Sequence, residues 1–149
     1  MNKLTIAAVA VLSMSLAHTA TARDANEDAI KARQAAFTLI AANTGPMGAM
    51  MKGEMPFDKK AFAQHASNVE VLSGMPWSFF IPGSQKGDTK AKPDVWNKAE
   101  DYRAKAEKFQ EQAGKLAMVA KNGDESAIKK QFGATVKTCK SCHDDYKSK

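Results

Sequence analysis

The residues with the clearest potential for chemistry lie near the C-terminus, where Cys139, Cys142 and His143 stand in the sequence Cys-Lys-Ser-Cys-His. Two cysteines three positions apart, followed directly by a histidine, are the attachment signature of c-type haem. On a helix both thiols share one face, so they can reach the two vinyl groups of one porphyrin edge. His143 lies four residues after Cys139 and points from that face toward the iron. The motif therefore predicts covalently attached haem c with His143 as an axial ligand.

Other uses of a cysteine pair fit this sequence less well. A redox-active pair would be expected in a βαβ context, which is absent. A zinc site would need two further ligands, and His65 is the only other histidine after residue 22. A disulfide between Cys139 and Cys142 would be strained on a helix.

The N-terminal residues have the composition of a secretory signal peptide. A basic start at residues 1–3 is followed by a 14-residue apolar run at 4–17 and by Ala20-Thr21-Ala22, an A-x-A cleavage pattern. The run is shorter than the roughly 20 residues that span a bilayer. We predict cleavage after Ala22, a mature domain of residues 23–149 without a membrane span, and a periplasmic location. Export agrees with haem attachment, since thiols of exported proteins must be oxidised, metallated or capped.

The rest of the chain is predicted to form four helices. The 149 residues are 44% hydrophobic and only 7% aromatic, a composition that suits one helical domain. The first helix is expected to be capped by Asp24 or Asn26 and to end at Gly45-Pro46. The second begins at Asp58 and ends at Gly74-Met75-Pro76, and the fourth covers residues 125–147.

The third predicted helix, residues 93–122, has the most regular pattern. Its apolar positions alternate in steps of four and three, as in a heptad: Val95, Ala99, Tyr102, Ala106, Phe109, Ala113, Leu116 and Ala120. The fourth helix has a stripe of Ile128, Phe132, Val136, Cys139, His143 and Tyr146. Four amphipathic segments predict an all-α fold, an antiparallel four-helix bundle with up-down-up-down topology.

Several segments of this sequence resemble the cytochrome c′ family of class II c-type cytochromes. They are residues 27–37, the Met75-Pro76-Trp77 turn, residues 92–96 and the terminal residues 139–146. The resemblance covers essentially all of residues 23–149. The position of the haem motif in the last helix also separates this chain from class I cytochromes c, in which it lies near the N-terminus.

The resemblance implies a homodimer of left-handed bundles with one haem c per subunit and His143 as the only axial ligand. The sixth position of the iron would then face Phe37, and a phenyl ring cannot donate to iron. Trp77 and Phe80 would wall the same distal pocket, where relatives often carry Leu or Met in place of Phe37.

The resemblance also implies that Arg33 and Gln34 meet the haem propionates. Arg33 lies on the apolar stripe of its helix, where an unpaired charge is costly, so we expect an anionic partner or access to solvent. Family members usually carry arginine four residues after the haem histidine, whereas this chain has Lys147. That position lies one helical turn from His143 on the proximal face, and a lysine there could contact the ligand or simply be solvated.

These residues predict a five-coordinate, high-spin haem protein that binds NO, binds CO weakly and transfers single electrons. It would not be an enzyme in the strict sense, and its redox partner would be an unidentified periplasmic protein. The alternative is a six-coordinate, low-spin electron carrier with a methionine or His65 as sixth ligand. The lysines are spread along all helices without interleaved aromatic residues, so nucleic-acid binding is not predicted.

Overall fold

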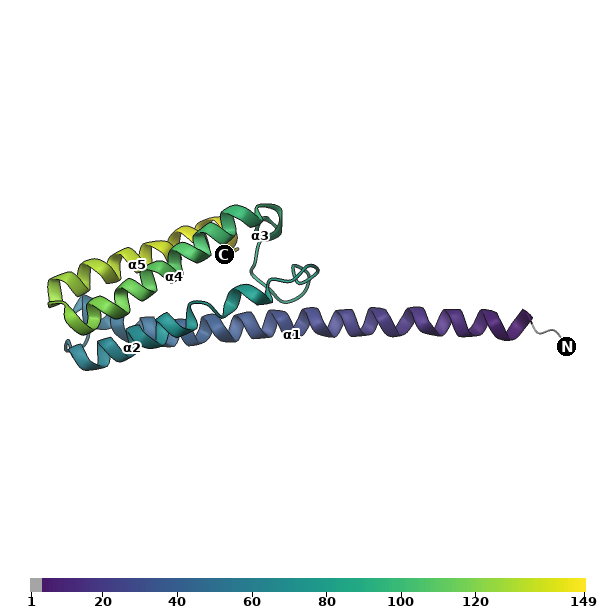
Figure 1. The fold of residues 1–149 in the computed structure, drawn as a ribbon, viewed down its shortest axis with the longest axis horizontal. Coiled ribbons are helices and arrows are strands. Elements are labelled where there is room, and N and C mark those ends of the chain that lie inside the picture. Colours follow the sequence, from purple (N-terminus) through teal and green to yellow (C-terminus); the bar gives the residue numbers. More distant parts are fainter. Residues whose placement is uncertain (1–3) are drawn as a thin grey trace.

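The computed structural model describes the backbone of residues 4–149 and the side chains of residues 25–149. Its helices are α1 (Leu4–Lys52), α2 (Lys59–Leu72), the 3-10 helix η1 (Pro76–Phe79), α3 (Asp94–Asn97), α4 (Ala99–Asn122) and α5 (Glu125–Tyr146). The last part of α1 and the helices α2, α4 and α5 lie side by side and alternate in direction, while α1 extends beyond them toward the N-terminus (Figure 1). The predicted all-α, antiparallel four-helix bundle is confirmed.

The bundle is held together by one apolar core to which all four helices contribute. Phe62 of α2 is fully buried and meets Phe132 of α5 edge-on, with ring centroids 5.8 Å apart. Burial of this apolar surface is the main force that pairs the helices. The buried members of the core are Ile40, Met47, Met50, Phe62, Ala66, Val69, Phe109, Ala113, Leu116, Ala120 and Ile128.

Two predicted helix starts are confirmed by their capping hydrogen bonds. The Asp58 carboxylate accepts from the backbone N–H groups of Lys60 and Ala61 at 2.9 and 3.0 Å. The Asp124 carboxylate accepts from the N–H of Ala127 at 2.8 Å and begins α5 in the same way. Each cap satisfies N–H groups that have no partner within the helix.

The prediction for the first helix was wrong at both ends. Asn26 lies inside α1, and α1 continues through Pro46 to Lys52. Proline removes one backbone hydrogen bond of the helix. The added turn, however, buries Met47 completely and leaves Met50 only 7% exposed, and this apolar burial offsets the loss.

The third and fourth helices also depart from the predicted patterns. The third is divided at Lys98, whose φ of −122° and ψ of 46° leave the helical region, so Ala99 is exposed rather than buried. The short helix before the break carries Val95 into a second cluster with Tyr102 and Tyr146. In α5 Val136 is 42% exposed.

Thr135 is buried in α5 next to the exposed Val136 because its hydroxyl has partners on two helices. It donates toward the carbonyl of Gln131 at 3.0 Å and that of Gln112 on α4 at 3.2 Å. The Gln131 side chain adds a 2.8 Å bond to the Gln112 amide oxygen. A buried hydroxyl is tolerated when it is hydrogen-bonded, and here the bonds join α4 to α5.

The predicted signal peptide, residues 1–22, falls on residues whose side chains lie outside the described part of the chain. It therefore stays a prediction. Within the described residues, no helix combines the length and the apolar character needed to cross a bilayer.

Candidate haem site

A cavity of about 670 Å³ opens between α1, α4, α5 and the segment that follows η1. The nine residues predicted for the five-coordinate haem site all line it, although they come from distant parts of the chain: Arg33, Gln34, Phe37, Trp77, Phe80, Cys139, Cys142, His143 and Lys147. Its volume lies within the ~300–1,000 Å³ of typical cofactor and ligand pockets.

The wall contributed by α5 carries the haem-attachment motif. Cys139 and Cys142 are both partly buried and form no disulfide. Burial raises the pKa of the Cys139 thiol and raises that of Cys142 to about 11. Both thiols are thus protonated at neutral pH, which disfavours a reactive redox pair because the thiolate is the nucleophile.

The environment of His143 suits an iron ligand. Although His143 is exposed as a whole, partial desolvation lowers the pKa of its imidazole, and the nearby Lys147 ammonium lowers it further. A neutral imidazole keeps a nitrogen lone pair available for a metal. Lys147 thus lies close enough to His143 to act on it electrostatically, while its side chain is exposed.

A second wall of the cavity is aromatic and comes from α1, η1 and the residue after η1. The ring of Phe37 meets Trp77 edge-on at 5.7 Å and Phe80 at 6.4 Å between centroids. The Trp77 indole N–H donates to the carbonyl of Ser73 at 2.6 Å. This bond fixes the indole and leaves it no N–H to offer to a ligand.

Arg33 is 2% exposed, and four of its N–H groups are directed at the last residue of η1 and at the segment after it. They bond to the carbonyls of Phe79 and Ser84 and to the hydroxyls of Ser84 and Thr89. Arginine has five N–H donors, so one remains. Its partners within the described part of the chain are neutral oxygens, and the side chain is buried rather than open to solvent. Contact with a propionate stays a prediction.

The remaining rim of the cavity is cationic. Lys90, Lys105 and Lys147 line it together with Arg33, Lys105 being paired with Asp145 outside the lining, and no lining residue of the described chain is acidic. Gln34 lies at the same rim, where its exposed side chain donates to the carbonyl of Asp88 at 2.9 Å. Such a rim suits a group with two carboxylates, as haem has. The residues present therefore fit haem c in cavity size, attachment chemistry and charge.

The described lining of the cavity offers no second iron ligand of the kind expected in the six-coordinate alternative. Among the described residues that line it, His143 is the only histidine and methionine does not occur. His65 lies elsewhere, with its Nδ1 3.0 Å from Oδ1 of Asn43 at the contact of α1 and α2. Met47 and Met50 belong to the apolar core.

Tyr102 and Tyr146 also line the cavity, although the sequence suggested only that they are core positions. The rings of Tyr102 and Tyr146 meet edge-on at 5.1 Å, and the Tyr146 hydroxyl donates to the Asp101 carboxylate. Burial raises the pKa of both hydroxyls. Their places on apolar stripes were visible in the sequence. Their proximity to the cavity was not, because it depends on how α4 and α5 pack.

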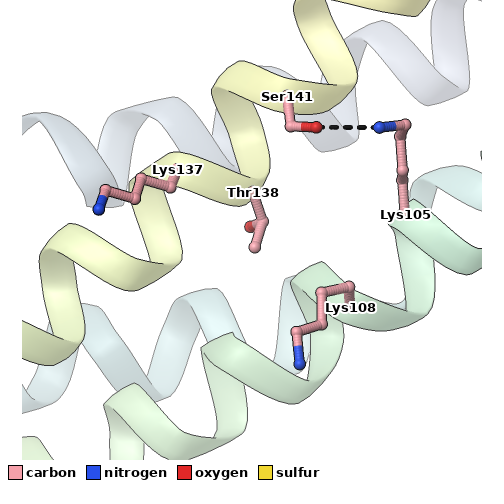
Figure 2. A pocket seen from close by; sticks show the side chains of 5 residues that line it. All are labelled: Lys105, Lys108, Lys137, Thr138 and Ser141. Atoms are coloured by element: carbon pink, nitrogen blue, oxygen red, sulfur yellow. Dashed lines mark hydrogen bonds between the residues drawn. The ribbon is translucent and has the colours of Figure 1, made fainter.

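Beside the haem cavity lies a shallow hollow of about 170 Å³ between α4 and α5, lined by Lys105, Lys108, Lys137, Thr138 and Ser141 (Figure 2). Lys105 donates to the Ser141 hydroxyl at 2.9 Å and pairs with Asp145 at 3.0 Å. Lys108 pairs with Glu111 at 2.7 Å. The hollow is the outer surface of the haem-binding helix, and two of its lysines are already paired with carboxylates.

Comparison with known proteins places the chain in a family. The family model described as Cytochrome C' matches residues 28–147. Cytochrome c′ of Rubrivivax gelatinosus is 46% identical over 82% of this chain and 95% of its own length. The structure of cytochrome c prime from Shewanella frigidimarina is 49% identical, covers 83% of this chain and 97% of its own, and superposes with a TM-score of 0.82.

A third relative has been solved with a ligand. It is the nitric oxide complex of a variant of cytochrome c prime from Alcaligenes xylosoxidans, 36% identical over 83% of this chain and 96% of its own, with a TM-score of 0.77. With identities above a third over nearly the whole of each relative, the chain belongs to the cytochrome c′ family, whose members carry covalently attached haem c.

Proposed function

We propose that this protein is a periplasmic cytochrome c′ with five-coordinate, high-spin iron that binds NO, binds CO weakly and can transfer single electrons. The observation that carries the proposal is the lining of the cavity. The described lining includes one histidine, His143, and no methionine. Phe37 lies in the aromatic wall formed with Trp77 and Phe80.

On the proximal side, the chain holds the cofactor and presents one ligand. Cys139 and Cys142 lie one helical turn apart on α5 and would supply the two thioether sulfurs. His143 offers a neutral imidazole, and the Lys147 ammonium helps to keep it unprotonated. Bound haem supplies an iron centre that can take a diatomic ligand or a single electron.

On the distal side, the residues favour NO over O2. Bound O2 gains from a nearby hydrogen-bond donor, because negative charge develops on it. Phe37 has no donor, and the Trp77 N–H is already bonded to Ser73. NO binds ferrous haem without such help, and the solved nitric oxide complex of the Alcaligenes relative is consistent with this preference.

The absorption and EPR spectra of the purified ferric protein test the coordination state. We expect high-spin signals, and His65→Ala should leave them unchanged because His65 lies outside the cavity lining. Low-spin signals would overturn the five-coordinate assignment. If they vanished in His65→Ala, or came with a sulfur-to-iron charge-transfer band, the six-coordinate alternative would replace it.

We further propose that residues 1–22 are removed on export and that the mature chain forms a homodimer. Leu39 and Val71 are 51% and 68% exposed. Each lies about one turn from the contact between Asn43 of α1 and Asn68 of α2. The two apolar side chains therefore belong to one outward face of the α1–α2 pair, where a second copy could cover them.

Sedimentation of the mature holoprotein tests this dimer. We expect a dimer for the wild type and a monomer for Leu39→Lys/Val71→Lys, because two buried lysine charges would oppose association. Met118→Lys is the matched control, since Met118 is 59% exposed on α4 rather than on the α1–α2 face. A monomeric wild type, or a double variant that stays dimeric, would contradict the proposed interface.

A further inference from the structure

The strap is the segment of residues 79–92, which starts at the last residue of η1, is irregular from Phe80 onward and covers part of the haem cavity. Four of its residues, Phe80, Thr89, Lys90 and Ala91, line the cavity. Its far end is fixed to the end of α5. Lys92 N–H donates to the Tyr146 carbonyl at 2.9 Å, and Ser148 N–H donates to the Lys90 carbonyl at 2.8 Å.

The middle of the strap is irregular and depends on glycine. Gly83 and Gly87 have φ values of 94° and 118°, which side-chain-bearing residues rarely adopt. At Gly83 an added Cβ would also lie 2.8 Å from the Asn26 side chain of α1. The strap thus has little regular structure of its own, and its position depends on contacts with the helices.

Arg33 supplies the main contact with α1. Nη1 donates to the Phe79 carbonyl at 3.1 Å and to the Ser84 hydroxyl at 2.8 Å. Nη2 donates to the Ser84 carbonyl at 2.7 Å and to the Thr89 hydroxyl at 2.9 Å. One guanidinium therefore joins three points of the strap, and bonds from a charged donor are about twice as strong as neutral ones.

The same guanidinium also fixes an aromatic ring of the distal wall. Its central carbon lies 4.6 Å from the centroid of Phe80 and 5.7 Å from that of Trp96, a favourable arrangement for a cation. Phe80 in turn meets Phe37 edge-on. A path of direct contacts therefore runs from Arg33 through Phe80 to Phe37.

We propose that Arg33 is a positioning residue that clasps the strap over the distal side of the cavity and thereby limits the rate at which diatomic gases enter. The proposal rests on the proposed gas-binding function. Loss of the guanidinium would leave two strap carbonyls without their partner and free the Phe80 ring, so the strap would open more often. Lysine would keep the positive charge, but its single ammonium group could not bond to all three points of the strap as the planar guanidinium does.

The rate of CO association with the ferrous holoprotein, measured after flash photolysis, tests the clasp. We expect Arg33→Met to raise the rate about tenfold, with a smaller rise for Ser84→Ala and an intermediate one for Arg33→Lys. Ser84 is the informative position because it bonds to Arg33 without lining the cavity. Arg103→Met is the matched control, since it removes an exposed arginine of α4.

Hydrogen exchange of the same holoproteins gives a second readout that does not require gas binding. The amides of Ser84, Lys86 and Thr89 form bonds within the strap. We expect them to exchange faster in Arg33→Met and Ser84→Ala, with α4 amides unchanged.

Two outcomes would overturn the clasp. One is unchanged strap exchange in Arg33→Met. The other is faster CO entry in Arg33→Met with no response in Ser84→Ala, which would assign the effect to direct contact between Arg33 and haem. If even the wild type bound no CO, the gas-binding function would fail, and the exchange data alone would decide whether Arg33 holds the strap.

Discussion

Phe37→Ala is expected to raise the CO affinity of the ferrous protein tenfold or more, equivalent to about 1.4 kcal/mol of relieved steric cost. Phe37 lines the cavity with its ring edge-on to Trp77 and Phe80. Trp77 is itself held by its bond to Ser73, so the phenyl ring cannot move aside in the direction of Trp77. Removal of the ring opens space for a ligand without adding a donor, and CO titration of the reduced protein measures the change.

The control for this prediction is Phe57→Ala. Phe57 contributes a phenyl ring to the apolar core, 5.9 Å from Phe62, and does not line the cavity. Its loss should reduce stability with little effect on CO affinity. Equal CO affinities of Phe37→Ala and the wild type would contradict the distal placement of Phe37, and an equal gain in Phe57→Ala would point to general loosening of the bundle.

Replacing both Cys139 and Cys142 with serine is expected to abolish covalent haem attachment. The two thiols are the only ones in the chain, and a hydroxyl does not form the thioether bond. Intact-mass spectrometry of the exported protein should show the haem adduct in the wild type and none in the double variant. Each single variant should keep at most one thioether.

Ser141→Ala is the matched control because Ser141 lies between the two cysteines and its side chain is exposed, where it accepts a bond from Lys105. We expect it to keep the full haem mass. A covalent adduct in the double variant, or no adduct in the wild type, would refute attachment through this motif.

Short-range patterns were sufficient for much of the fold. The caps at Asp58 and Asp124 were predictable because a capping carboxylate bonds to N–H groups two or three residues away. The buried stripe of α4 was predictable because helical geometry repeats within a few residues. The extension of α1 through Pro46 was not, since it depends on burial of Met47 and Met50 against other helices.

The same division applies to the candidate site. Sequence spacing was enough to predict the haem motif, because Cys139, Cys142 and His143 share one helical face whatever surrounds them. The partners of Arg33 were decided by tertiary structure. Ser84, which accepts two of its bonds, lies 51 residues later in an irregular segment with no periodicity to interpret. Local geometry thus determines what one helix face can bind, whereas the neighbours of a buried charge depend on how the whole chain folds back on itself.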